Sequence, residues 1–415
     1  MKIYISGISG TGMGPLALMA KDAGLEVLGS DLNKGAIYEE LVKAGIKVFI
    51  GKQDGEFLRE NLEGLDWFVY TSALSEDHPE LLAAKEAGVK VTKRDDFTAF
   101  LVEKLGLKMV AVAGTHGKTT TTSMIIWAAL KLGLPVSYVV GTTLGFAPSG
   151  SYHSGDKYFI YEADEYDRNF LKFHPWTAVI TYVSYDHPDI YSTREEYVRA
   201  FLQFEGQSEN VMRAEHSTKR EFKLAGAARR TDAELAFRAI KMMSSDEAKK
   251  GKMPSSEVEF DEILEATLND FPGVGRRFER LADGIYTDYA HHPEEIAATV
   301  EMAQEQAEMD GLKGVVVVYQ PHQNTRQHEV REGYSEAFNG VTKVFWLPTY
   351  LTRENPELKV LKPEELYEGI DVAETAELDD GLFDEILKWR DDGYLVILMT
   401  AGPADGWLRE KLGKL

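Results

Sequence analysis

The order of apolar segments along the chain is the feature that most constrains its fold. Short apolar runs alternate with segments of helical periodicity almost throughout. This order predicts an α/β protein built on parallel sheets, because a crossover helix must connect consecutive parallel strands. The expected strands are residues 2–6, 26–30, 46–50, 67–72, 89–93, 109–113, 136–140, 158–164, 177–184, 285–288, 314–320, 343–348 and 394–400. The expected helices include 13–23, 79–87, 118–131 and 293–309.

The length of 415 residues suggests between two and four domains. We expect three domains, at residues 1–105, 106–271 and 272–415, with boundaries where the alternation of strands and helices is interrupted. Residues 104–108 are a candidate linker, and the polar stretch 244–257 is interpreted as a surface loop. The strand–helix pattern weakens between residues 205 and 227.

Composition excludes several classes of function. The net charge of −22 argues against nucleic-acid and anionic-membrane partners. No apolar run is long enough for a transmembrane helix, and glycines follow the start of the chain too soon for a signal peptide. The absence of cysteine excludes disulfides and thiolate metal sites. We therefore expect a cytoplasmic protein.

A glycine-rich segment with one lysine, GTHGKTT, joins an expected strand to an expected helix. It comprises Gly114, Thr115, His116, Gly117, Lys118, Thr119 and Thr120. Glycines let backbone N–H groups surround a phosphate at the helix N-terminus, and a lysine reaches the outer phosphates. The Thr119 hydroxyl is placed to bind Mg²⁺. Val112 stands where the general pattern has glycine, so the compact form is more informative. The alternative is a glycine turn capped by threonines.

Polar side chains follow two further expected strands. Glu162 ends one strand, and Asp186 and His187 follow the other. The carboxyl ends of parallel strands line the ligand crevice of such sheets. Glu162 and His187 could therefore hold a second Mg²⁺, although histidine is an unusual ligand for this ion. The alternative is solvated acids at strand ends, and we interpret Asp164, Glu165 and Asp167 as loop acids.

The first expected strand also leads into glycines, in the segment ISGISGTGMGPLA. Its spacing departs from the strict dinucleotide fingerprint, so it is a weak signal for NAD. Asp31 ends the second expected strand, where a carboxylate suits a ribose or base contact. A tight turn without a ligand is the alternative.

These segments together resemble the Mur ligase family, whose members join amino acids to the peptidoglycan precursor. The compact phosphate loop, EADEYD and YDHPDIY carry the resemblance in the middle of the chain. GRRFE, TDYAHHPEEI, YQPHQNTR and MTAGPAD carry it near the C-terminus, in the family's order. The likeness covers most of the chain and is greatest to the alanine-adding members. It implies a Rossmann-like UDP-sugar-binding first domain, a P-loop central domain and a Rossmann-like third domain that contacts ATP and the amino acid.

The resemblance also implies partners and residue roles. The cofactors would be ATP and Mg²⁺, and the substrates UDP-N-acetylmuramate and L-alanine or a similar amino acid, in peptidoglycan synthesis and hence cell shape and division. The implied sugar-nucleotide contacts are Gly10, Thr11, Gly12, Met13, Asp31 and Ser72. The implied metal ligands are Thr119, Glu162 and His187, and Asp288 would contact the ATP ribose. The implied catalytic residues are Lys118, Glu162, His187, Arg326, His322 and His291. A guanidinium such as that of Arg326 binds phosphate or carboxylate in bidentate fashion.

One segment departs from the family pattern. The middle domain is shortened, and Ala228, Arg229 and Asp232 stand where the family has His, Asn and Asn near the nucleotide base. Because of this departure, one alternative is that the protein is a non-catalytic UDP-sugar-binding relative of the family. A ligase that recycles murein tripeptide onto the same sugar is a second alternative. An NAD-dependent oxidoreductase is a weaker one, since it leaves the phosphate loop unexplained.

Overall fold

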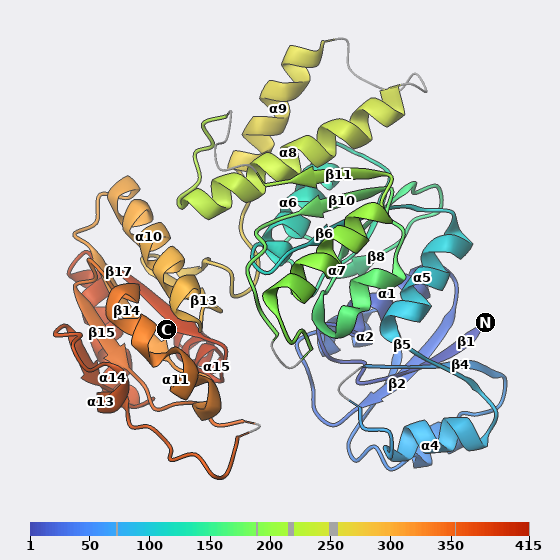
Figure 1. The fold of residues 1–415 in the computed structure, drawn as a ribbon, viewed down its shortest axis with the longest axis horizontal. Helices are drawn as coiled ribbons and strands as arrows, with labels where there is room; N and C mark the ends of the chain where they lie inside the picture. The colour runs from blue at the N-terminus through green and yellow to red at the C-terminus, as the bar shows by residue number, and fades with distance from the viewer. Residues whose placement is uncertain (72–73, 188–189, 215–219, 249–255, 353, 415) are drawn as a thin grey trace. The chain divides into compact units, whose positions relative to one another are not determined.

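A computed structural model describes residues 1–71, 74–187, 190–214, 220–248, 256–352 and 354–414. It is an α/β structure with three sheets (Figure 1), as the sequence predicts. The chain forms two compact units, one of Met1–Phe222 with Thr231–Pro272 and one of Lys223–Arg230 with Gly273–Leu415. The first unit contains two of the sheets and the second unit contains the third. The boundaries of the three domains expected from the sequence stay a prediction.

The first sheet is parallel throughout, in the order β3-β2-β1-β4-β5. Its strands are β1 (Lys2–Ser6), β2 (Glu26–Asp31), β3 (Lys47–Ile50), β4 (Leu65–Tyr70) and β5 (Lys90–Lys93). The helices are α1 (Gly14–Asp22), α2 (Tyr38–Lys43), α3 (Glu56–Glu60), α4 (Pro79–Glu86) and α5 (Arg94–Leu105). The strand order reverses between β1 and β4, so the crevice for a ligand lies at the carboxyl ends of these strands.

The second sheet has the order β11-β10-β6-β9-β7-β8 and is parallel except for the β7–β8 pair. Its strands are β6 (Lys108–Ala113), β7 (Val136–Val139), β8 (Gly150–Ser151), β9 (Tyr158–Glu162), β10 (Thr177–Ile180) and β11 (Asn210–Arg213). The helices of this region are α6 (Lys118–Lys131), α7 (Arg194–Gly206), α8 (Ala227–Ala248) and α9 (Glu257–Asn269). Helix α6 has the predicted bounds.

Two expectations for this region need correction. Only Gly106 and Leu107 separate α5 from β6, so residues 104–108 form a helix end and a tight connection instead of a linker. The predicted surface loop 244–257 is wrong for residues 244–248, which end α8, and for Glu257, which begins α9. Glu247 is buried there because its carboxylate accepts hydrogen bonds from Lys157 Nζ, at 2.5 Å, and from the Tyr158 hydroxyl.

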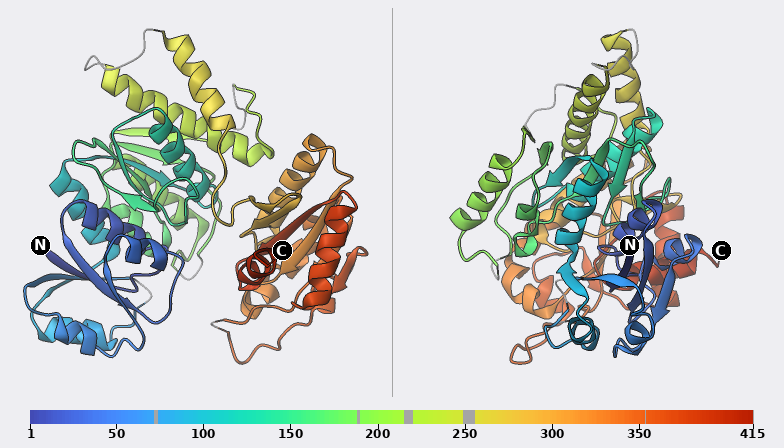
Figure 2. Two further views of the ribbon diagram at one scale, coloured as in Figure 1. Left: turned by 180° about the vertical axis from the view of Figure 1, so that it is seen from behind. Right: turned by 90° about the vertical axis from the view of Figure 1, so that its right-hand side faces the viewer.

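The third sheet has the order β12-β13-β17-β14-β15-β16, and only the β12–β13 pair is antiparallel. Its strands are β12 (Glu279–Ala282), β13 (Ile285–Asp288), β14 (Val315–Gln320), β15 (Lys343–Trp346), β16 (Ala373–Thr375) and β17 (Leu395–Thr400). The helices are α10 (Pro293–Met309), α11 (Asn324–Val330), α12 (Tyr334–Ala337), α13 (Pro363–Leu366), α14 (Asp380–Asp391) and α15 (Ala404–Leu412). Helix α10 has the predicted bounds. Figure 2 shows this unit from two further sides.

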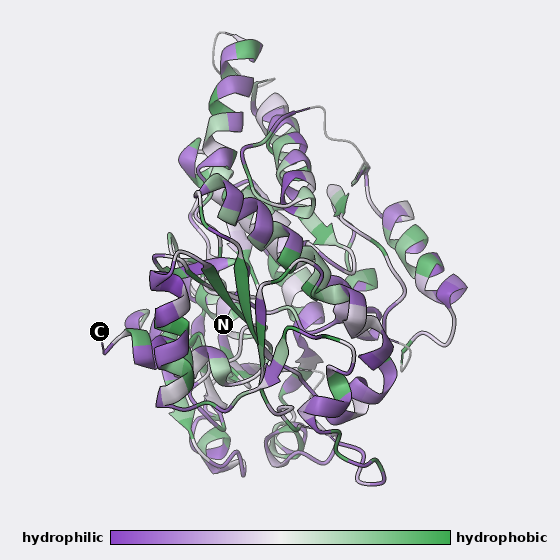
Figure 3. Cartoon of the chain, turned by 90° about the vertical axis from the view of Figure 1, so that its left-hand side faces the viewer, coloured by the Kyte–Doolittle hydropathy of each residue, from purple (hydrophilic) through white to green (hydrophobic). Residues whose placement is uncertain are grey.

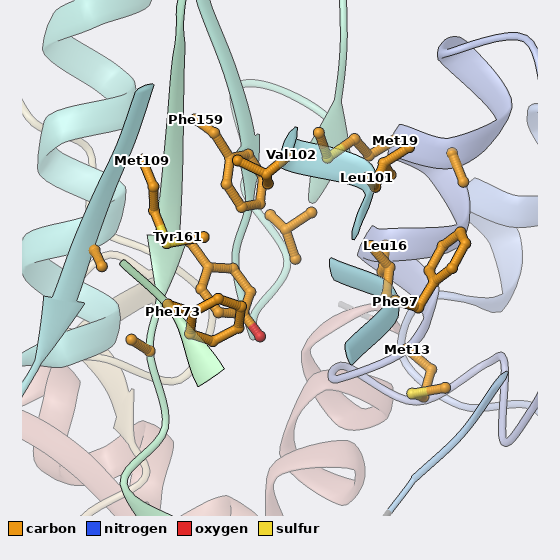
Figure 4. Close-up of a cluster of buried hydrophobic side chains, with 14 of the residues drawn as sticks. Met13, Leu16, Met19, Phe97, Leu101, Val102, Met109, Phe159, Tyr161 and Phe173 are labelled. Carbon is orange, nitrogen blue, oxygen red and sulfur yellow. The ribbon is translucent and has the colours of Figure 1, made fainter. Parts of the chain in front are cut away.

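One hydrophobic cluster joins the two sheets of the first unit (Figure 4). Met13, Leu16 and Phe97 enter it from the side of the first sheet, and Phe159 and Tyr161 enter it from β9. Strands carry mostly hydrophobic residues, whereas helices mix hydrophobic and hydrophilic ones (Figure 3). Among the described residues, no helix is long and apolar enough to cross a membrane. The shared cluster explains why these two sheets form one compact unit.

Replacing Phe97 tests the stabilising role of this cluster. The Phe97 ring is fully buried and lies edge-on to Trp67, with ring centroids 5.1 Å apart. We expect Phe97→Ala to lower the free energy of unfolding by about 3–5 kcal/mol, because it removes buried surface and leaves a cavity. Urea unfolding followed by tryptophan fluorescence measures this loss. Leu82→Ala, at a side chain that is 43% exposed, is the control. A loss below about 1 kcal/mol for Phe97→Ala would contradict the expectation.

Candidate active site

The phosphate-loop segment lies between the buried strand β6 and helix α6. Two of its glycines are required by geometry. Gly114 has φ of 146°, and a Cβ there would lie 2.0 Å from the Thr181 hydroxyl oxygen. Gly117 is the residue before α6 and has φ of 83°, a left-handed conformation that favours glycine. The N–H group of Thr115 donates to the Tyr182 carbonyl at 2.7 Å, and the loop ends at the N-terminus of α6, where an anion is favoured. Phosphate binding by this loop stays a prediction.

Lys118 is held by acceptors around the loop. Its Nζ donates to the Gly114 carbonyl at 2.5 Å and to the Glu165 carboxylate at 2.9 and 3.1 Å. Glu165 lies in the loop after β9, as interpreted, but it is only 1% exposed and is therefore not a solvated acid. Burial favours the neutral forms of both groups, but their mutual attraction outweighs it. The pKa of Lys118 is therefore raised and that of Glu165 lowered, so both are charged near neutral pH.

The predicted metal ligands do not form one cluster. Thr119 Oγ1 donates to Glu162 Oε1 at 2.7 Å, so these two oxygen donors lie together and suit Mg²⁺. His187, which has φ of 57°, instead lies against Glu165, with 3.6 Å between Nε2 and Oε1. The described part of the chain contains no group of three or more His, Asp or Glu side chains arranged to hold a metal ion. The role of each as a ligand stays a prediction.

The first glycine loop lies at the carboxyl end of β1. The backbone N–H of Ser9 donates to Asp31 Oδ2 at 3.0 Å, so Asp31 fixes this loop from the end of β2. Gly10, Thr11 and Gly12 follow in the turn, and Gly10 O accepts from the N–H of Met13 at 3.2 Å. The Met13 side chain is buried in the hydrophobic cluster (Figure 4), which leaves only its backbone near the loop. Ser72, the last predicted contact, lies outside the described residues.

The segment that departs from the family pattern supports the phosphate loop. Asp232 on α8 is 7% exposed, and its Oδ1 accepts a hydrogen bond from Thr121 Oγ1 at 2.9 Å. The same oxygen lies 2.6 Å from the position that a Cβ on Gly117 would take. Ala228 and Arg229 lie on the first turn of α8, within the second compact unit. No sequence pattern predicts the contact between Asp232 and the loop, since Thr121 and Asp232 are 111 positions apart along the chain.

The C-terminal candidates lie in the second unit. The rings of His291 and His322 are 5.8 Å apart, and burial lowers the pKa of His291. Arg326 lies on α11, partly exposed, and no hydrogen bond or ion pair to it occurs among the described residues. Asp288 is buried, which raises its pKa, and its carboxylate accepts the N–H groups of Phe278 and Ala290.

The neighbouring arginine Arg276 serves the structure of this unit. Its Nη2 donates to the Thr400 carbonyl at 2.6 Å, and its guanidinium lies over the Tyr289 ring. It therefore has protein partners within the second unit.

The fold and the loop define the chain as an α/β protein with a P-loop. Comparison with known sequences gives the family. The Mur ligase family, catalytic domain, matches residues 2–104, and the Mur ligase middle domain matches residues 112–227. A UDP-N-acetylmuramate–L-alanine ligase of Thermosynechococcus vestitus is 32% identical over 85% of this chain and 82% of its own. One of Lactobacillus delbrueckii subsp. bulgaricus is 29% identical over 100% and 99%.

Solved structures show the same fold. The UDP-N-acetylmuramate–alanine ligase of Thermotoga maritima has a TM-score of 0.78 at 22% identity, covering 100% of this chain and 99% of that one. A murein peptide ligase of Psychrobacter arcticus has a TM-score of 0.61 at 21% identity, with the same coverage. The chain belongs to the Mur ligase family and is a ligase, as the motifs predict.

The left-handed glycine before α6 gives a test of the phosphate loop. We expect Gly117→Ala to weaken ATP binding at least ~10-fold, because left-handed backbone costs an alanine about 1–2 kcal/mol and Asp232 would have to move. Isothermal titration with ATP measures the affinity, and circular dichroism checks the fold. Gly145→Ala is the control, since nothing lies within 4 Å of its Cβ position. Affinity within twofold of the wild type would refute a nucleotide role for this loop.

Proposed function

We propose that this protein is an ATP-dependent, ADP-forming ligase that adds L-alanine to UDP-N-acetylmuramate in peptidoglycan precursor synthesis. The observation that carries the proposal is the phosphate loop, with Lys118 at its helix N-terminus and Thr119 beside Glu162. The similarity to UDP-N-acetylmuramate–L-alanine ligases over nearly the whole chain supplies the substrates. Because the reaction consumes ATP and a sugar nucleotide, we place the protein in the cytoplasm.

The chemistry explains why such an enzyme needs a phosphate loop. A carboxylate is a poor electrophile, so a carboxylate oxygen of the sugar first attacks the γ-phosphorus of ATP and ADP leaves. The amino acid's amine then attacks the carbonyl carbon of this acyl phosphate. The tetrahedral intermediate expels inorganic phosphate, the nitrogen loses a proton, and an amide remains. Two easier steps replace one difficult step.

The residues of the chain take separate roles in this proposal. The loop N–H groups and Lys118 bind the phosphates and stabilise the charge of the transferring phosphoryl group. Thr119 and Glu162 would hold Mg²⁺, with His187 as a further ligand, and the ion would neutralise phosphate charge. Arg326, whose guanidinium has no protein partner among the described residues, is free to bind a phosphate or carboxylate, and His291 and His322 orient the amine substrate.

Phosphate release tests the proposal directly. ATP, Mg²⁺ and UDP-N-acetylmuramate are mixed with the protein, and L-alanine, L-serine, glycine or murein tripeptide is added in turn. We expect release that requires UDP-N-acetylmuramate and L-alanine and falls at least ~100-fold in Lys118→Ala, since that variant loses a charge that acts on the transition state. Mass spectrometry identifies the amide product.

Other outcomes of this assay assign other functions. Release with the tripeptide alone would make the protein a murein peptide ligase. Binding of UDP-N-acetylmuramate without any phosphate release would make it a non-catalytic sugar-nucleotide-binding protein. Binding of NAD in place of the sugar nucleotide would point to the oxidoreductase alternative.

A further inference from the structure

Glu165 is a buried acid that the proposed reaction does not use. It is 1% exposed and lies in the loop that follows strand β9, which ends at Glu162. A buried carboxylate is costly unless charged partners and hydrogen bonds compensate it. Its surroundings therefore indicate what the protein gains by keeping it.

Two groups assigned to ATP and metal binding meet at this one carboxylate. Lys118 Nζ donates to Oε2 at 2.9 Å and to Oε1 at 3.1 Å. His187 Nε2 lies 3.6 Å from Oε1, within charge contact but beyond a hydrogen bond. Lys118 comes from the start of α6 and His187 from the segment after β10, so Glu165 connects the ends of three neighbouring strands.

Glu165 itself is held in place from behind. The Tyr191 hydroxyl donates to its backbone carbonyl at 2.6 Å, and the Tyr197 hydroxyl lies 3.4 Å from Oε1. The Tyr197 hydroxyl also lies 2.8 Å from Thr115 Oγ1, within the phosphate loop. The carboxylate is thus fixed relative to the loop by side chains that are themselves buried, as a group that orients others must be.

We propose that Glu165 is a positioning residue that holds the Lys118 ammonium and the His187 imidazole in place for the nucleotide and its metal ion. It acts through these two side chains and does not touch the reacting atoms. Because its negative charge lies beside the phosphate position, it also opposes phosphate binding in the ground state. Only the expected change in kcat rests on the proposed function, whereas the expected changes in analogue affinity do not.

The isosteric variant Glu165→Gln separates these effects. We expect kcat to fall ~10–100-fold, the usual cost of losing a group that orients a ligand-binding side chain. We expect the affinity for a non-hydrolysable ATP analogue without Mg²⁺ to stay equal or rise, since a repelling charge has gone. Mg²⁺ should raise the affinity of the wild type for the analogue, and we expect this increase to be ~10-fold smaller in Glu165→Gln.

Glu195→Gln is the matched control, because it removes the same charge from an exposed position at the start of α7. Thermal unfolding of each variant checks that the fold is intact. If Glu165→Gln unfolds, Glu165→Asp keeps the charge but shortens its reach, and the same loss of the Mg²⁺-dependent increase in analogue affinity is expected.

Three results would overturn the inference. One is a Mg²⁺-dependent increase in analogue affinity that is within twofold of the wild-type increase in Glu165→Gln. Another is a kcat of Glu165→Gln within twofold of the wild type. The third is analogue affinity that falls in proportion to kcat, which would indicate general damage to the site. If the wild type binds the analogue but releases no phosphate with any acceptor, the proposed function fails, while the Mg²⁺-dependent increase in analogue affinity still tests Glu165.

Discussion

Burial of strand β6 fixes where the charges of this site can lie. Val110, Ala111, Val112 and Ala113 are at most 1% exposed, and β6 has β9 and β10 as its two neighbours. A charged side chain would be costly at these four buried positions, so the polar chemistry of the site begins where the strand ends. Gly114 is the first residue beyond that end, and it must be glycine because Thr181 of the adjacent segment lies against it. The phosphate loop is thus a consequence of the packing of the sheet.

A protein with a net charge of −22 has to bind polyanionic substrates by local means. Backbone N–H groups and the N-terminus of α6 supply positive potential without adding formal charge. Lys118 adds the formal charge, and Glu165 balances it while the lysine is buried. Burying that lysine alone would cost more than the pair does, so the acid also permits the lysine to occupy the loop.

The sequence predicts those parts of the molecule whose signals are local. The bounds of α6 and α10 follow from glycine and proline at their starts and from helical periodicity, and the buried strands follow from uninterrupted apolar runs. No continuous apolar run marks strand β11, because it lies at the sheet edge and is only half buried. The burial of Glu165 is not predictable from the sequence, because acids in a loop are normally solvated and only folding brings Lys118 to it. No pattern within a segment encodes a contact between residues 47 positions apart.

Asp232 shows why a departure from a family pattern has to be judged in three dimensions. Read along the sequence, an acid at a position where the family has an amide looks like a loss near the nucleotide. In the structure its carboxylate accepts the Thr121 hydroxyl of α6 and packs against Gly117. An amide of the same shape could also accept that hydrogen bond, so the difference between Asp and Asn here is charge. A negative charge beside a phosphate loop opposes an anionic ligand. Asp232 therefore keeps the hydrogen bond from Thr121 that supports the loop, as an amide could, but it adds a negative charge beside the loop. The hydrogen bond and the charge are separate properties of this residue.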